Sequence, residues 1–142
     1  MSNKLPIEKQ VCTQPQAEEL AGLLEDDAPE SLWRYVEKER QYADPVYKLQ
    51  TDCWFSEIYF YAYTGDELGE VLPSVIFWNH KKYFLDVYPS DKRDEWNACY
   101  VCVNDYGNVL DIQRESTQAQ AKAALAIQGL KDGWIKKEDF VY

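Results

Sequence analysis

The sequence has few of the residues that build catalytic centres. It contains one histidine, His80, among 142 residues, so no site made of several histidines can form. Gly65 and Gly69 lack the lysine that a phosphate-binding loop uses, and no serine occupies a nucleophile-elbow context. The carboxylates are scattered, so a hydrolase that uses them is the least favoured interpretation. We therefore expect a non-enzymatic protein with no catalytic residues.

Clusters of positive charge and long apolar runs are also missing. The chain has 15 Lys and Arg against 25 Asp and Glu, a formal net charge of −10. Binding to nucleic acid needs clustered Lys and Arg that displace counterions, so direct nucleic-acid binding is not expected. No segment approaches the length of a membrane span or resembles a signal peptide, which predicts a cytoplasmic location away from membranes. The acidic balance fits solubility, and it also fits a basic partner.

Four cysteines are present, and two of them, Cys99 and Cys102, have the C-x-x-C spacing of zinc and redox sites. Their surroundings predict a strand, on which residues three apart point to opposite faces, so the two thiols should diverge. Cys12 and Cys53 could complete a four-thiolate site, but ordinary buried cysteines are the favoured interpretation. In a cytoplasmic protein the thiols should be reduced. We expect no metal and no cofactor.

Aromatic residues, in contrast, are plentiful at 15% of the chain. They concentrate in Trp54–Tyr63, where both alternating sets of side chains are apolar or aromatic. This pattern predicts a central strand covered on both faces. Thr64 then begins a helix, with Glu67 reaching back to the cap, and Pro73 ends it.

Two further helices have similar start signals. Thr13 with Gln16 forms a capping box for a helix over Gln14–Glu25. Thr117 with Gln120 begins a helix with an apolar stripe, and Gly133 is a natural C-cap. Alternating apolar residues predict strands over Ser31–Glu37, Val46–Leu49, Val75–Trp78, Lys81–Tyr88, Trp96–Val103 and Val109–Arg114.

The connections between these strands suggest hairpins. Asn79-His80 is typical of a tight turn, and Asn104–Asn108 predicts another turn by composition. Regular alternation of strands and helices is missing, so the fold class is α+β, with one mostly antiparallel sheet packed with about three helices. Residues 1–10 are expected to be a flexible lead-in and residues 11–142 one domain, with Trp134, Ile135 and Phe140–Tyr142 docked as a tail.

Several short motifs together suggest a family. In chain order they are Val11-Cys12, Gln16-Ala17-Glu18-Glu19-Leu20, Ser31-Leu32-Trp33, Ala62-Tyr63-Thr64, Glu67-Leu68-Gly69-Glu70-Val71-Leu72-Pro73, Thr117-Gln118-Ala119-Gln120-Ala121 and Gly133-Trp134-Ile135. This set spans most of the chain and resembles a family of small uncharacterised accessory proteins encoded on phages, prophages and other mobile elements. The resemblance implies a mobile-element accessory protein without an assigned activity, and it assigns no functional residue.

The leading interpretation is an interaction protein with a protein partner, acting as an antagonist of a host or rival system. Recognition should use acidic loops, and the candidate binding residues are Asp91, Asp94, Glu95 and Trp96. Tryptophan is enriched at binding hot spots, although Lys92 and Arg93 partly offset the charge of this loop. The alternative is a small-ligand-binding protein whose pocket is lined by Tyr and Trp. The sequence leaves the partner and the oligomeric state open.

Overall fold

The computed structural model describes residues 6–38, 46–53, 57–91 and 94–140. The helices in these ranges are α1 (Ile7–Gln10), α2 (Gln14–Leu24), α3 (Gly65–Val71) and α4 (Gln118–Asp132), with short 3-10 helices η1 (Glu25–Asp27) and η2 (Lys137–Asp139). The strands are β1 (Arg34–Lys38), β2 (Val46–Gln50), β3 (Tyr59–Tyr61), β4 (Val75–Trp78), β5 (Lys81–Pro89), β6 (Trp96–Cys102) and β7 (Asp105–Glu115).

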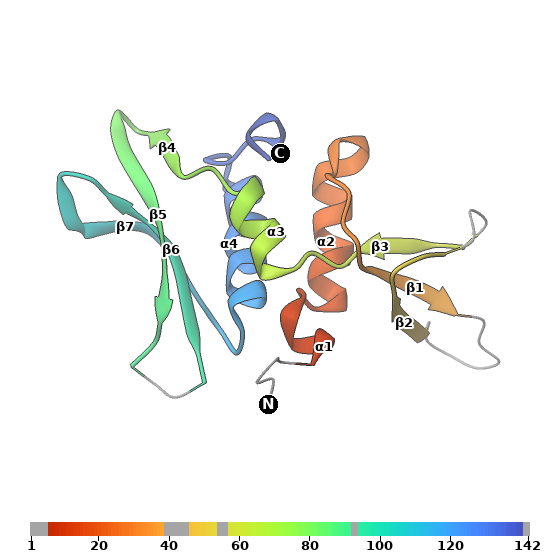
Figure 1. Cartoon of the computed structure of the whole chain (residues 1–142). Helices are drawn as coiled ribbons and strands as arrows, with labels where there is room; N and C mark the ends of the chain where they lie inside the picture. The colour runs from red at the N-terminus through yellow and green to blue at the C-terminus, as the bar shows by residue number, and fades with distance from the viewer. Residues whose placement is uncertain (1–5, 39–45, 54–56, 92–93, 141–142) are drawn as a thin grey trace.

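The strands form two antiparallel sheets, one in the order β2-β1-β3 and the other in the order β4-β5-β6-β7. Helices α2, α3 and α4 lie between the sheets, with α4 against the larger sheet and α2 toward the smaller one (Figure 1). The α+β class is confirmed. The expectation of one sheet is wrong, because the chain leaves the smaller sheet after β3, passes through α3, and only then begins β4.

The aromatic stretch is not a central strand, which corrects the sequence prediction. Strand β3 covers only Tyr59–Tyr61, and it pairs with β1 alone at one edge of the smaller sheet. One set of its aromatic rings is stabilised by a cation, since the Arg34 guanidinium lies 5.2 Å from the Tyr59 ring and 5.5 Å from the Tyr61 ring. Phe60, which points to the other side of the strand, packs on the core. Trp54 and Phe55 lie outside the described residues.

The threonine caps are formed much as predicted. Thr13 and Thr64 each make a complete capping box with the residue three positions later. At Thr117 the structure shows one half of the box, in which the Gln120 amide donates to the threonine oxygen at 3.1 Å. Helix α4 ends at Gly133, whose φ of 88° is the left-handed conformation that glycine adopts without strain. Helix α2 ends at Leu24, one residue earlier than predicted.

Helix α4 is buried on more than the predicted stripe. Ala123, Ala126 and Ile127 are buried as expected, and so are Ala119, Ala121, Leu125 and Gly129, because the helix is enclosed by the sheet and by α2 and α3. Gly129 permits the closest contact. A Cβ atom there would lie 2.5 Å from Ile135 Cδ1. The predicted docking of the tail is confirmed for Trp134, Ile135 and Phe140, which are all buried.

The β4–β5 hairpin has the predicted turn. Asn79 and His80 both have positive φ angles, 50° and 66°, as a two-residue turn of this kind requires. A turn joins β6 to β7, but it lies at Val103–Asn104 rather than over the predicted Asn104–Asn108, because β7 already begins at Asp105. The residues that read as a turn instead lie where the pairing of β6 with β7 shifts, at a β-bulge.

Two further boundaries differ from the sequence prediction. The expected strand over Ser31–Glu37 begins only at Arg34. Ser31 is held outside the sheet because its hydroxyl bonds the Glu67 carboxylate at 2.7 Å. The expected lead-in contains helix α1. In the described part of the chain, no helix is long and apolar enough to span a bilayer.

Candidate functional site

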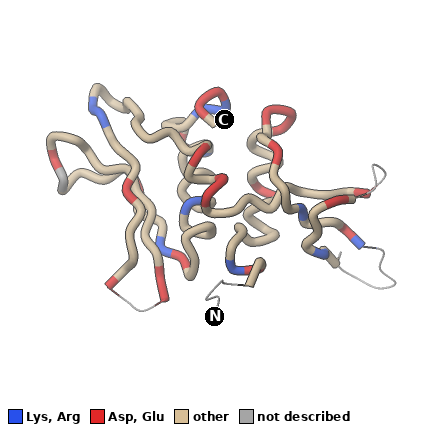
Figure 2. Tube along the Cα trace, viewed as in Figure 1, with Lys and Arg blue, Asp and Glu red and all other residues tan. Residues whose placement is uncertain are grey.

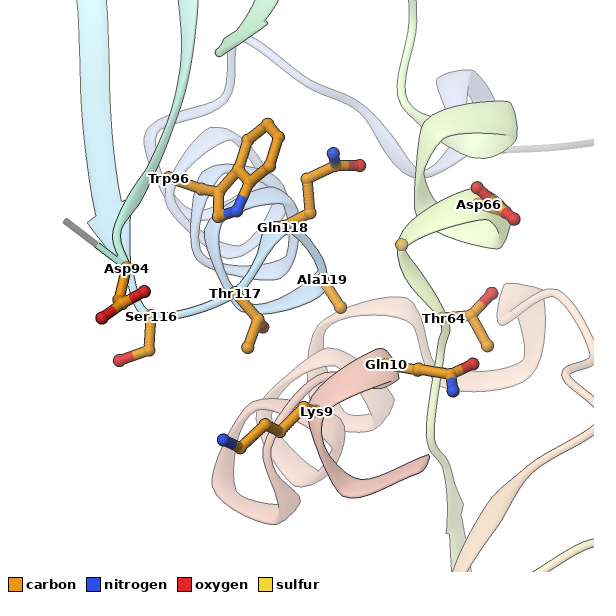
Figure 3. A pocket seen from close by; sticks show the side chains of 11 residues that line it. Lys9, Gln10, Thr64, Asp66, Asp94, Trp96, Ser116, Thr117, Gln118 and Ala119 are labelled. Carbon is orange, nitrogen blue, oxygen red and sulfur yellow. The ribbon is translucent and has the colours of Figure 1, made fainter. Parts of the chain in front are cut away.

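A hollow of about 650 Å³ opens where four segments meet: α1, the start of α3, the start of β6 and the start of α4 (Figure 3). Its lining combines one aromatic ring, Trp96, with hydroxyl, amide and charged side chains. The lining residues are Lys9, Gln10, Thr64, Gly65, Asp66, Asp94, Trp96, Ser116, Thr117, Gln118 and Ala119. The volume lies within the range of about 300–1,000 Å³ that small-molecule pockets occupy.

The hollow is shaped by two helix starts held side by side. Gly65 lies so close to α4 that a Cβ atom there would be 3.5 Å from the Ala119 amide nitrogen. Lys122 donates from its Nζ to the Gly65 carbonyl oxygen at 2.9 Å, which ties α4 to α3. Burial lowers the pKa of Lys122, and the negative charge of Asp66 partly opposes that shift. The Gln16 side chain donates to the Gln120 carbonyl at 3.0 Å and ties α2 to the same turn.

The structure divides the predicted site residues. Asp94 and Trp96 line the hollow. Asp91 is exposed and is not among the lining residues. Glu95 lies 3.9 Å from Arg114 in an ion pair, so its charge is partly balanced. The predicted loop therefore contributes two residues to one concave site rather than four residues to one patch.

Asp94 has an unusual backbone, with a φ of 64°. Aspartate and asparagine adopt this left-handed conformation more readily than most residues. The strained conformation comes just before β6, whose first residue is Trp96. An Asp94→Asn change would remove the charge and keep a residue that tolerates the same backbone.

The lining offers binding groups of both charges. Lys9 contributes a cation, while Asp66 and Asp94 contribute carboxylates. The first amides of α4 also lie here: the Thr117 cap satisfies Gln120 and Ala121, and the two preceding amides begin the helix beside the hollow. Trp96 is half-buried and adds an apolar surface. Such a mixture suits a ligand with both apolar and polar parts.

Most of the hollow was not predicted from the sequence. Lys9, Gln10 and Gln118 are ordinary polar residues, and they meet only because α1 packs beside α4. The caps at Thr64 and Thr117 are the usable signal, since they mark the two helix starts that form the wall. The sequence does not indicate which two helix starts come together, because this depends on how the helices pack.

The four cysteines are free thiols in different surroundings. Cys102 is buried in the core against α4, while Cys99 lies on the opposite face of β6 and donates from its Sγ to the Asp86 carbonyl. Burial raises the pKa of Cys99 to about 11 and that of Cys12 to about 12. Within the described ranges, no group of three or more His, Cys, Asp or Glu side chains is arranged to hold a metal ion. His80 is exposed at the hairpin tip.

We expect one of the four thiols to react quickly in the folded protein. Cys53 is half-exposed, whereas Cys12, Cys99 and Cys102 are buried. Thiolate is the reactive form, and burial with a raised pKa keeps the thiol of Cys12 and Cys99 protonated. Titration with a chromogenic disulfide at neutral pH should show one fast thiol, and four after denaturation. Two or more fast thiols in the native protein, or a fast thiol that persists in Cys53→Ser, would contradict this placement.

Comparisons with protein-family models, with curated proteins and with solved structures found no match to this chain.

Proposed function

We propose that the protein is a non-enzymatic interaction protein whose hollow at the start of α4 binds a segment of a protein partner. One observation carries this proposal. Asp94 and Trp96, which the sequence singles out as binding residues, lie on the wall of a hollow large enough for several side chains. The accessory role on a mobile element, with antagonism of a host or rival system, is part of the same proposal and rests on the resemblance of the sequence motifs.

The charge of the hollow favours a segment that contains Lys or Arg. The described residues that line the hollow include two carboxylates, Asp66 and Asp94, and one lysine, Lys9, and the chain as a whole carries a net charge of −10. A cationic side chain can also stack on the Trp96 ring. The hydroxyl and amide groups of Ser116 and Gln118 can bond the backbone of an extended peptide.

A small-molecule ligand is the second candidate, and the volume of the hollow favours it. A cavity of about 650 Å³ is of ordinary size for a metabolite. The lining differs from the expected pocket of Tyr and Trp, because among the described residues that line it Trp96 is the aromatic one and none is a tyrosine. Native mass spectrometry of the purified protein tests this candidate, since a retained metabolite would appear as a discrete added mass.

A random peptide-display library panned against the immobilised protein tests the main proposal. We expect enriched peptides to contain Lys or Arg and to bind Asp94→Asn at least about tenfold more weakly, which is the effect of losing about 1.4 kcal/mol. Asp91→Asn is the matched control, because it removes the same charge from the same loop outside the hollow. Association should also slow as ionic strength rises.

Two results would count against the proposal. One is a panning experiment in which no peptide prefers the wild type over Asp94→Asn. The other is a set of peptides that Asp91→Asn and Asp94→Asn weaken equally, because the loop charge rather than the hollow would then explain binding.

A further inference from the structure

Helices cover one face of the larger sheet, and the described helices leave its other face uncovered. Tyr83, Ala98, Tyr100 and Cys102 point toward the helices and belong to the core. The alternate residues point away, and in the described part of the chain no helix lies against that side (Figure 1). We call it the outer face; its members include Val75, Phe77, Lys82, Phe84, Asp86, Tyr88, Cys99, Val101, Val109 and Ile112.

The outer face is apolar through its middle. The strand register sets Val75, Phe84, Val101 and Val109 in one row across all four strands. Phe77 beside this row is 74% exposed, and Ile112 is 45% exposed. Val101 and Cys99 are themselves buried, so the apolar side chains that this face exposes belong mainly to the neighbouring strands, among them Val75, Phe77 and Ile112. Several exposed apolar side chains gathered on one face of a sheet are typical of a contact site.

Each end of the same sheet carries residues of both charges, since Asp105 begins β7 at the end that holds Lys81 and Lys82, and Arg114 pairs with Glu95 at the other end. Lys81 and Lys82 lie at the tip of the β4–β5 hairpin, whereas Asp91, Asp94 and Glu95 lie at the other end of β5 and β6 (Figure 2). On the outer face itself, strand β5 presents Lys82, Phe84 and Asp86 in succession. Along β5 the charge therefore changes sign, with an apolar residue between the two charges.

We propose that the outer face binds the outer face of a second copy of this chain, with the strands of the two copies antiparallel. A two-fold axis that crosses the strands at Phe84 places Lys82 of each copy opposite Asp86 of the other. Stacked sheets lie about 10 Å apart, a separation that these side chains span. The arrangement uses the same surface on both copies, as a two-fold contact requires. It does not rest on the proposed function, because the hollow lies on the side of the sheet that carries α4.

The size of the face and the net charge set the expected strength. Four strands of this length cover roughly 450 Å², about half of the area that each partner contributes to a standard interface. The net charge of −10 opposes association at long range. Salt at physiological strength screens that repulsion beyond about 8 Å, while contacts across the interface are shorter. We therefore expect a dimer that forms in the micromolar range and dissociates on dilution.

Sedimentation velocity of the full chain from about 1 to 300 μM tests the proposal. The wild type should shift from monomer to dimer over this range, and Phe77→Ser should weaken dimerisation at least about tenfold. Leu32→Ser is the matched control, because Leu32 is 65% exposed but lies outside the larger sheet. It should dimerise like the wild type.

A charge exchange tests the orientation of the two copies. Lys82→Asp and Asp86→Lys should each weaken the dimer by placing like charges opposite one another, and the double variant should restore it. A wild type that stays monomeric throughout the range overturns the proposal. A different protein would then be the candidate partner for the outer face. A dimer that Phe77→Ser leaves intact, or that the double variant fails to restore, also overturns it.

Discussion

Replacing Phe140 by alanine should lower the free energy of unfolding by about 3–5 kcal/mol, the usual cost of removing a buried phenylalanine ring. Phe140 is fully buried, although it is the last residue of the described ranges. Its ring meets the Tyr63 ring edge to face, with centroids 6.5 Å apart. The large effect is expected because the ring packs against the segment that leads into α3.

Urea denaturation followed by circular dichroism measures this loss. Phe77→Ala is the matched control, since it removes the same ring from a position that is 74% exposed. At protein concentrations where the chain is monomeric, the control should change stability by less than about 0.5 kcal/mol. A Phe140→Ala variant as stable as this control would show that the tail does not dock.

Leu68→Ala should cost about 2–5 kcal/mol, the range for a leucine removed from a well-packed core. Leu68 is fully buried on the inner side of α3, between Thr64, which caps the helix, and the buried Val71. The size of the loss depends on how far the neighbouring residues relax into the cavity. Because α3 forms part of the hollow's wall, the same change should also lower the affinity for any ligand that binds there.

Urea denaturation also measures the loss of stability in Leu68→Ala. Leu32→Ala removes the same side chain from a position that is 65% exposed, and it should be nearly neutral. If Leu68→Ala and Leu32→Ala were equally mild, the amphipathic helix drawn for α3 would be wrong.

Local signals in the sequence predicted the helix starts and one tight turn. Thr13, Thr64 and Thr117 act through bonds to residues three positions away, so their role is visible in a short window. Asn79 likewise tolerates the positive φ that its hairpin turn demands. These predictions needed no knowledge of distant segments.

The arrangement of strands into sheets could not be predicted in the same way. The aromatic run over Trp54–Tyr63 has the alternation of a strand covered on two sides, but its described strand lies at an edge. A cation from β1, Arg34, supplies the contact that a second covering layer would otherwise provide. Nothing near the aromatic run in sequence indicates that partner.

Two of the four predicted binding residues lie in the lining of the hollow. Trp96 and Asp94 are predicted because a tryptophan beside acidic residues is typical of binding surfaces, and both line the hollow. Asp91 and Glu95 are predicted on the same ground, but they are not among the residues that line the hollow. Asp94 has a left-handed backbone just before β6 begins at Trp96, and a short window of sequence does not reveal that conformation.

The central claim is that the hollow at the start of α4 is where a partner binds. The side-chain indole signals of the five tryptophans in a nitrogen-15 NMR spectrum test it most directly, with the Trp96 signal identified by its loss in Trp96→Phe. Addition of a basic peptide selected by panning should shift the Trp96 signal in the wild type and in Asp91→Asn, and much less in Asp94→Asn. A peptide that binds and shifts other indole signals while Trp96 stays unchanged would contradict the claim.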